Sequence, residues 1–175
     1  MVMKFDFSDR LARLYDKISV EEVEAFLITK PVNVNYFSNF RGDSTALLIG
    51  KNFRQLVTDG RYLEQANRQA KNFAVVEQTE GLYKKLVDVI KNTGCKKIGV
   101  EGLVMTVAQH AYLAKEIPGV EFKSVELDTL RQSWNILCAN SARKKLLSRR
   151  LLLPVNAALF RTARRPIKKS ARANW

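Results

Sequence analysis

The chain has 175 residues, of which 46% are hydrophobic and 27% are charged, with only 8 Gly and 4 Pro. This composition is typical of a folded globular chain and excludes collagen-like or broadly disordered sequences. A chain of this length buries enough surface to fold as one domain without disulfide or metal staples.

The net charge of +13 is distributed unevenly along the chain. All 17 acidic residues lie within residues 1–130, where 18 Lys and Arg nearly balance them. Residues 131–175 contain the other 12 Lys and Arg and no acidic residue. Since ordinary protein surfaces mix both signs of charge, we predict a domain over residues 1–130 and a basic tail over residues 131–175 that is out of reading frame or disordered.

Cysteine usage and the N-terminal sequence indicate the cellular compartment. Only Cys95 and Cys138 are present, without a CxxC or Cys/His cluster that would indicate a disulfide framework or a zinc site. Lys4, Asp6 and Asp9 interrupt any apolar export segment, and no apolar run approaches about 18 residues. We therefore expect a cytoplasmic protein without a membrane span.

The first elements along the chain are predicted from hydrophobic spacing. After Ser8, an expected helix N-cap, apolar residues within 11–18 recur at helical spacing. The apolar run 25–29 predicts a buried strand, and the Asn-rich, aromatic segment 31–40 predicts a short helix or loop. Two strand-like runs within 46–58 flank a Gly-Lys-Asn turn and predict a hairpin.

From residue 61 onward, helical and strand patterns alternate. The spacing predicts three helices, each followed by a strand: helices over 61–70, 82–90 and 107–113, with strands at 73–76, 98–100 and 120–125. Strands that alternate with helices of this length predict a layered α/β domain with a largely parallel or mixed sheet.

Motifs for several common kinds of catalysis are missing. The single histidine, His110, has no Cys, Asp or Glu at the i+3 or i+4 position that could complete a helical metal site. We expect it to be a surface or capping residue. The sequence contains no GxGxxG, GxxxxGK[ST] or GxSxG motif, which argues against dinucleotide binding, P-loop phosphoryl transfer and nucleophile-elbow hydrolysis.

Asp59-Gly60-Arg61-Tyr62 marks a tight turn from a strand into a helix. Asp59 can cap the helix by accepting backbone N–H bonds. The same turn places an Arg and a Tyr at the carboxyl end of a strand, where open α/β sheets bind ligands.

Three ordered motifs resemble one known family: PVNVNYFSNFRG at 31–42, TDGRY at 58–62, and IGVEG at 98–102 followed by TVAQ at 106–109. Together they look like the creatinase N-terminal domain of aminopeptidase P and Xaa-Pro dipeptidases, over about residues 8–130. The resemblance implies an α/β domain with a mixed sheet, helices on its faces and a ribonuclease H-like motif. The sequence departs from the family pattern at Asn39, where Gly is usual, and at Asp43, where a small residue is usual.

In that family, catalysis belongs to a following pita-bread domain in which two Asp, one His and two Glu hold two divalent metal ions such as manganese or cobalt. This sequence matches none of that domain. The resemblance therefore implies a peptidase that is truncated before its catalytic domain and has no catalytic or metal-binding residue. We expect this chain to be inactive alone. It would act on a peptide substrate only together with the catalytic domain.

By resemblance, the domain contributes dimer contacts and a wall of the neighbouring active site, as a homodimer or paired with a full-length peptidase subunit. The residues that we expect to contact substrate across the dimer are Tyr36, Phe40, Arg41, Arg61 and Tyr62. The residues that we expect to shape the turns are Gly42, Asp59 and Gly60. The alternative is that Tyr36 and Phe40 are core aromatics and Arg41 is solvated.

Three interpretations of residues 131–175 remain open. An abrupt change to acid-free sequence where the resemblance stops is what a shifted reading frame produces. Alternatively, the tail is a basic interaction segment that binds nucleic acid or an anionic surface by counterion release. In the third interpretation, the domain is a non-catalytic regulator that pairs with a full-length subunit.

Overall fold

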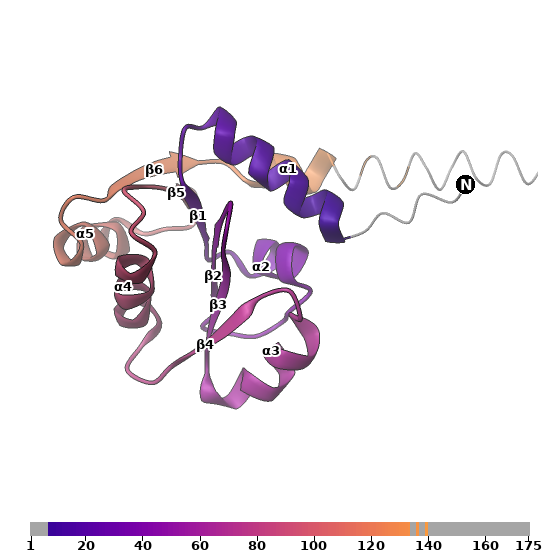
Figure 1. The fold of residues 1–175 in the computed structure, drawn as a ribbon, viewed down its shortest axis with the longest axis horizontal. Helices are drawn as coiled ribbons and strands as arrows, with labels where there is room; N and C mark the ends of the chain where they lie inside the picture. Colours follow the sequence, from indigo (N-terminus) through magenta and orange to yellow (C-terminus); the bar gives the residue numbers. More distant parts are fainter. Residues whose placement is uncertain (1–6, 134–135, 137–138, 140–175) are drawn as a thin grey trace, which may run out of the picture. The chain divides into compact units, whose positions relative to one another are not determined.

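A computed structural model describes residues 7–133, 136 and 139 (Figure 1). All of them except Ala139 belong to the first of the two units of the chain, Met1–Cys138. The elements follow one another as α1 (Phe7–Val20), β1 (Ala25–Ile28), α2 (Pro31–Ser38), β2 (Ala46–Gly50), β3 (Arg54–Asp59), a 3-10 turn (Gly60–Tyr62), α3 (Leu63–Gln69), β4 (Ala74–Gln78), α4 (Leu82–Thr93), β5 (Lys97–Glu101), α5 (Val107–Glu116) and β6 (Glu121–Val125).

The six strands form one mixed sheet in the order β4-β3-β2-β1-β5-β6. β2 pairs antiparallel with both β1 and β3, whereas β3 and β4, β1 and β5, and β5 and β6 pair parallel. β2 is therefore the strand that runs opposite to the other five. The α/β class and the mixed sheet predicted from the alternation of patterns are confirmed.

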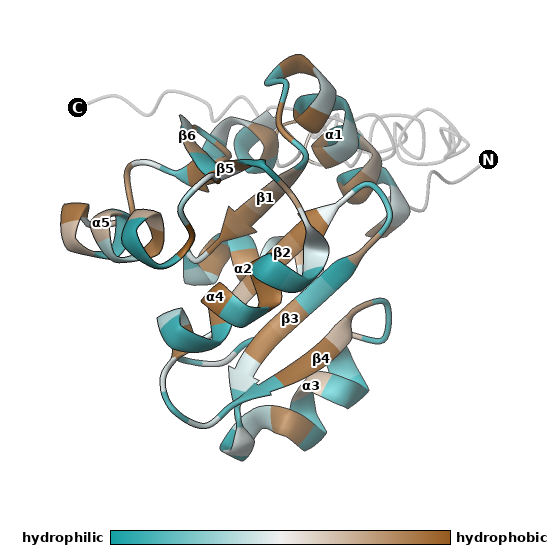
Figure 2. Ribbon diagram, turned by 60° about the vertical axis from the view of Figure 1, so that its left-hand side comes forward, coloured by the Kyte–Doolittle hydropathy of each residue, from teal (hydrophilic) through white to brown (hydrophobic). Residues whose placement is uncertain are grey.

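Helices cover both faces of the sheet, with α1, α2 and α3 on one side and α4 and α5 on the other (Figure 1). Side chains alternate along each strand, so Phe26 and Ile28 of β1 join the core under α1–α3, and Ala25 and Leu27 join the core under α4 and α5. Strands buried on both faces read as continuous apolar runs, as Figure 2 shows for β1. The short run AFLI of β1 is fully buried.

Local structure refines three of the predicted elements. Helix α1 already includes Ser8, so Ser8 is not its N-cap. The segment after Lys30 is a helix, because Pro31 is pre-organised for the first helical turn and Asn39 ends it in the left-handed conformation (φ 59°). The segment 61–70 divides into the 3-10 turn and α3, because Asp59 draws the first residues into a tighter turn.

The strand directions bring five segments to one edge of the sheet, the edge formed by the carboxyl ends of its parallel strands. Because β1, β3, β5 and β6 all run the same way, their carboxyl ends meet at the edge where β2 begins. Helix α2, the loop before β2, the turn after β3 and the residues after β5 and β6 therefore lie at this edge. Open α/β sheets bind ligands at such an edge.

Candidate functional site

An open pocket of about 480 Å³ lies at this edge of the sheet. Its lining comes from three segments: the first turns of α2, the loop before β2, and the turn after β3. The lining residues are Pro31, Val32, Asn35, Arg41, Gly42, Asp43 and Tyr62. The pocket thus joins parts of the first two sequence motifs, which are separated in sequence by the β2–β3 hairpin.

The loop between α2 and β2 is shaped by residues that tolerate unusual backbone or close packing. Asn39 adopts φ 59°, and Asn is the residue after Gly that accepts this conformation most readily. A Cβ on Gly42 would lie 2.6 Å from the Phe40 ring and 3.3 Å from Tyr62. Gln65 Nε2 of α3 donates to the Arg41 carbonyl oxygen at 2.7 Å, which ties the loop to α3.

Two aromatic residues predicted to contact substrate lie in the core, outside the lining of the pocket. Phe40 has no exposed surface and Tyr36 is 8% exposed, and both belong to the core under α1–α3. The Phe40 ring meets the Tyr62 ring edge to face, with centroids 6.1 Å apart. Phe40 therefore supports the pocket from behind, since its ring offers no surface to a ligand in this structure.

The turn after β3 places Tyr62 at the pocket. Asp59 Oδ1 accepts the Arg61 backbone N–H at 3.0 Å, as predicted for a cap. Asp59 Oδ2 also pairs with the Arg61 guanidinium at 2.7 Å, and this hydrogen bond holds the pKa of Asp59 below its ordinary value. The Arg61 guanidinium lies 5.5 Å from the centre of the Tyr62 ring. The exposed side chain of Arg61 is thus held beside the pocket, outside its lining.

The structure brings together three of the predicted residues, Arg41, Gly42 and Tyr62, in one lining. Asp59, Gly60 and Arg61 form the adjoining turn. Four lining residues were not predicted as site residues: Pro31, Val32, Asn35 and Asp43. Pro31, Val32 and Asn35 lie inside the first motif, and this membership is the only feature of the sequence that indicates them. They share one face only because α2 is helical.

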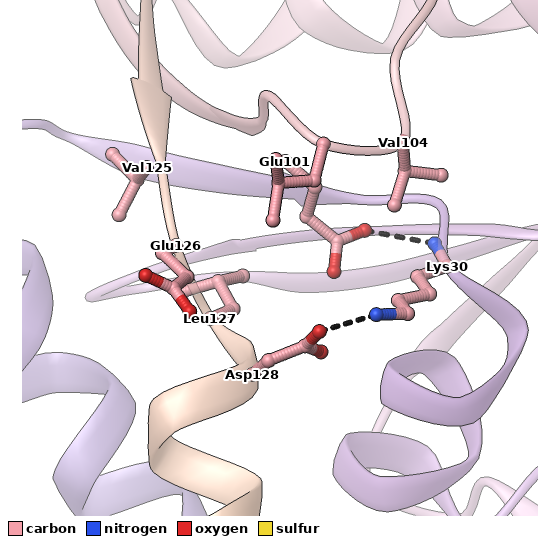
Figure 3. A pocket seen from close by; sticks show the side chains of 8 residues that line it. Lys30, Glu101, Val104, Val125, Glu126, Leu127 and Asp128 are labelled. Carbon is pink, nitrogen blue, oxygen red and sulfur yellow. Dashed lines mark hydrogen bonds and ion pairs between the residues drawn. The ribbon is translucent and has the colours of Figure 1, made fainter.

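A second polar cluster lies at the same edge, between β5, α2 and the residues after β6 (Figure 3). Glu101, at the end of β5, is 4% exposed. Its carboxylate accepts the backbone N–H groups of Thr29 at 2.7 Å and Lys30 at 2.8 Å, and Asn33 Nδ2 at 2.6 Å. A buried carboxylate with three N–H donors fixes the start of α2 and is itself compensated for the loss of water.

Asp128 closes this cluster from the other side. It accepts Asn33 Nδ2 at 3.0 Å and pairs with the Lys30 ammonium. The bond with Lys30 is the main reason that the pKa of Asp128 lies below its ordinary value. The cavity here measures only about 10 Å³, room for no more than one water. We therefore assign this cluster a role in holding elements together, and the candidate binding site is the pocket beside Arg41 and Tyr62.

The described residues do not fit the pair of metal ions that the resemblance implies for a whole peptidase. Within residues 7–133, no group of three or more His, Cys, Asp or Glu could hold a metal ion. Glu101 and Asp128, which share the Asn33 amide, are both engaged by N–H donors. His110 is exposed on α5, where its ring meets the Phe122 ring edge to face at 5.8 Å.

The helical segment at residues 128–133 extends beyond the predicted domain boundary at residue 130. Arg131 Nε donates to Asn33 Oδ1 at 3.2 Å, and the Arg131 guanidinium lies 3.8 Å from Asp128. These contacts assign Arg131 to the domain. The rest of the predicted tail, apart from residues 132, 133, 136 and 139, lies outside the described residues. Among the described residues, no helix is long and apolar enough to cross a membrane.

Sequence comparison identifies one family. Residues 10–133 match the model of the Creatinase/Prolidase N-terminal domain. The chain is 29% identical over 117 residues to the "uncharacterized peptidase YqhT" of Bacillus subtilis, an alignment that covers 67% of this chain and 32% of that protein. The chain thus spans about a third of the length of this curated relative.

Solved structures share the fold. The Xaa-Pro dipeptidase from Bacillus anthracis aligns with a TM-score of 0.65 and 26% identity, over 69% of this chain and 34% of that one. The N-terminal domain of the cytoplasmic peptidase PepQ from Mycobacterium tuberculosis aligns with a TM-score of 0.62 and 31% identity, over 71% of this chain and 97% of that one. The fold, the motifs and the family match agree, and the chain belongs to the Creatinase/Prolidase N-terminal domain family.

Proposed function

We propose that this chain serves as the N-terminal, non-catalytic domain of an Xaa-Pro aminopeptidase or dipeptidase. In this proposal the domain pairs with a second copy or with a full-length peptidase subunit, and its pocket becomes one wall of the neighbouring active site. The observation that carries the proposal is that Arg41 and Tyr62, from two separate family motifs, line one open pocket. The similarity to Xaa-Pro peptidases supplies the reaction class.

The chemistry of the lining suits a peptide. Arg41 is exposed and its side chain can meet a carboxylate or a peptide carbonyl. Asp43 is exposed nearby on the same loop and can meet a peptide N–H or an ammonium group. Val32, which is 51% exposed, and the Tyr62 ring supply apolar surface for a side chain such as a prolyl ring.

Hydrolysis requires groups that the described residues do not supply. Two divalent ions, such as manganese or cobalt, would polarise the scissile carbonyl and activate water in a whole peptidase. Since residues 7–133 offer no set of ligands for them, the domain's own part is to bind and orient the peptide. We place the protein in the cytoplasm, as for the cytoplasmic peptidase PepQ that shares its fold.

A chimeric enzyme tests the wall proposal. Residues 1–133 of this chain would replace the matched N-terminal segment of the Bacillus anthracis Xaa-Pro dipeptidase, and hydrolysis of Ala-Pro would be measured with Mn²⁺. We expect Arg41→Ala and Tyr62→Ala each to lower kcat/KM by about tenfold, mainly through KM, because each removes a contact made by the bound peptide. Lys71→Ala, at an exposed position outside the pocket, should leave kcat/KM unchanged.

Two results would overturn the proposal. If the chimera is active and neither pocket substitution changes its kcat/KM, the pocket is not a wall of the active site. Hydrolysis of Ala-Pro by the purified 175-residue chain with Mn²⁺ or Co²⁺ would show that the chain is catalytic by itself. Analytical ultracentrifugation of the purified chain tests the pairing separately, since a monomer at all concentrations, alone and mixed with a full-length peptidase, would exclude it.

A further inference from the structure

Helix α2 is the wall of the pocket on one side and is held by the polar cluster on another. Pro31, Val32 and Asn35 line the pocket. Asn33, between them in sequence, is 1% exposed and donates to Glu101 and Asp128 of the polar cluster. A rigid helix transmits displacement from one face to the other, so whatever moves Asn33 also moves the pocket wall.

The amide of Asn33 uses both of its polar ends. Its Nδ2 donates to Glu101 Oε1 at 2.6 Å and to Asp128 Oδ1 at 3.0 Å. Its Oδ1 accepts Arg131 Nε at 3.2 Å. A buried amide with these partners has one favourable orientation, because a rotation that breaks the bonds leaves polar groups unpaired away from water.

Two partners of Asn33, Asp128 and Arg131, belong to the segment that follows β6. Asp128 and Arg131 lie in the helical residues 128–133, called the exit helix. Asp128 also pairs with Lys30, the residue that precedes α2. The apolar neighbours Leu127 and Leu130 pack on the core that α2 shares. The exit helix and α2 are therefore joined by ion pairs, hydrogen bonds and a common apolar base.

We propose that Lys30, Asn33, Asp128 and Arg131, together called the clasp, couple the pocket wall to the helical segment 128–133. Glu101 anchors the clasp to the sheet. Asn33 and Asp128 are then positioning residues, which act on a bound peptide through α2. The inference rests on the proposed function only in treating the α2 surface as a substrate wall.

Coupling of this kind is reciprocal. If the contact between Lys30 and Asp128 couples the two helices, loss of either partner should loosen both α2 and the exit helix. This expectation distinguishes coupling from a local loss of stability. A local loss would loosen only the helix that carries the substitution.

Hydrogen exchange of the full chain, followed by mass spectrometry, tests the clasp. Asp128→Asn removes the charge from the exit-helix end, and Lys30→Met removes it from the α2 end while keeping an apolar stem. We expect each variant to accelerate exchange in both segments, 31–38 and 128–133, by about three- to tenfold, the size expected for loss of one hydrogen bond of ordinary net strength. Peptides from α4, on the opposite face, should exchange at the unchanged rate.

Further variants and a second measurement sharpen the test. The double variant should exchange no faster than Asp128→Asn alone, because that substitution already removes the contact with Lys30. Asp16→Asn, at an exposed position of α1, is the matched control and should change neither segment. Methyl NMR signals of Val32, on the pocket wall, should shift in Asp128→Asn.

If exchange accelerates only in the segment that carries the substitution, the two helices are not coupled. The proposal is also wrong if exchange accelerates in both segments but the Val32 methyl signals do not shift. If Asp128→Asn also accelerates α4, the variant is globally unstable, and Lys30→Met then decides between the outcomes. The measurement uses no peptide and no activity, so its failure leaves the chimera test of the wall intact, and failure of that test leaves the clasp intact.

Discussion

At the scale of single residues, the family motifs prove to be largely structural. Asn33 and Glu101, from two different motifs, meet in one buried hydrogen bond. A Cβ on Gly99 would lie 2.4 Å from the Phe26 ring, so this glycine lets β5 pack beside β1. Residues that identify the family thus build the end of the sheet beside which the pocket residues lie.

Glu101 carries the first prediction at this scale. Glu101→Ala should destabilise the protein by about 2–4 kcal/mol, because two backbone N–H groups and the Asn33 amide lose their acceptor in a buried place. Urea unfolding followed by circular dichroism measures the change. Glu64→Ala, at an exposed position of α3, should stay within about 0.5 kcal/mol of the parent. Equal effects of the two substitutions would contradict the role of Glu101.

Asp128 predicts a pH dependence. Its pKa in the folded state is lowered from the ordinary value of 3.8, chiefly by Lys30. A lowered folded pKa means that the carboxylate stabilises the fold above the unfolded value and loses this contribution as pH falls through the folded value. The difference in unfolding free energy between the parent and Asp128→Asn should be constant from pH 7 to 5 and shrink below about pH 4. A difference that is unchanged at pH 3 would show that the charge of Asp128 does not matter.

Single residues also show where sequence reasoning stopped short. Phe40 lies in an aromatic motif beside Arg41, and the pattern alone permits both a core and a ligand role for it. Its complete burial follows from the packing of Tyr62 and Gly42 against its ring. The contact with Tyr62 joins residues about 20 positions apart, so no local pattern reports it.

At the scale of elements, hydrophobic periodicity located nearly every helix and strand. The hairpin and the alternation after residue 61 follow from local patterns and turn chemistry, and the structure confirms them. The sequence of α2 permits either a helix or a loop, because its apolar residues show no helical face. It is enclosed by the sheet edge, α1 and the clasp, so tertiary contacts decide its conformation.

The start of α5 offers an element-scale prediction. Thr106 Oγ1 accepts the Gln109 backbone N–H at 3.2 Å, and Gln109 Oε1 accepts the Thr106 N–H at 2.9 Å, a complete capping box. Thr106→Ala should cost about 1 kcal/mol of stability. Thr79→Ala, at an exposed site without a cap, is the control for the loss of a hydroxyl. Unchanged urea midpoints for Thr106→Ala would mean that α5 does not depend on this cap.

At the scale of the whole molecule, the excess positive charge and the hydrophobic core lie in different parts of the chain. The buried core residues of the described part run from Leu11 to Leu127. Residues 131–175 hold 12 of the 30 basic residues and no acid. The stability of the domain and any affinity for polyanions should therefore belong to different parts of the chain.

Binding to nucleic acid tests this division. The full chain should bind fluorescent duplex DNA at low salt, with an affinity that falls steeply as salt is raised, because basic side chains displace counterions from phosphates. A chain of residues 1–139 should lose this binding and keep its thermal midpoint. Retained DNA binding by the shortened chain would place the interaction on the folded domain, and a lowered midpoint would show that residues 140–175 stabilise it.

The sequence by itself determined the fold class, the order of the elements and the family, because hydrophobic period, turn residues and ordered motifs are local properties of the chain. It also indicated Arg41, Gly42 and Tyr62. Only the tertiary structure decided that these residues share a pocket with α2, that Phe40 is buried beneath it and that Asn33 joins Glu101 to Asp128. The order of strands in the sheet brings these distant segments together, and that order depends on how side chains pack across the two cores.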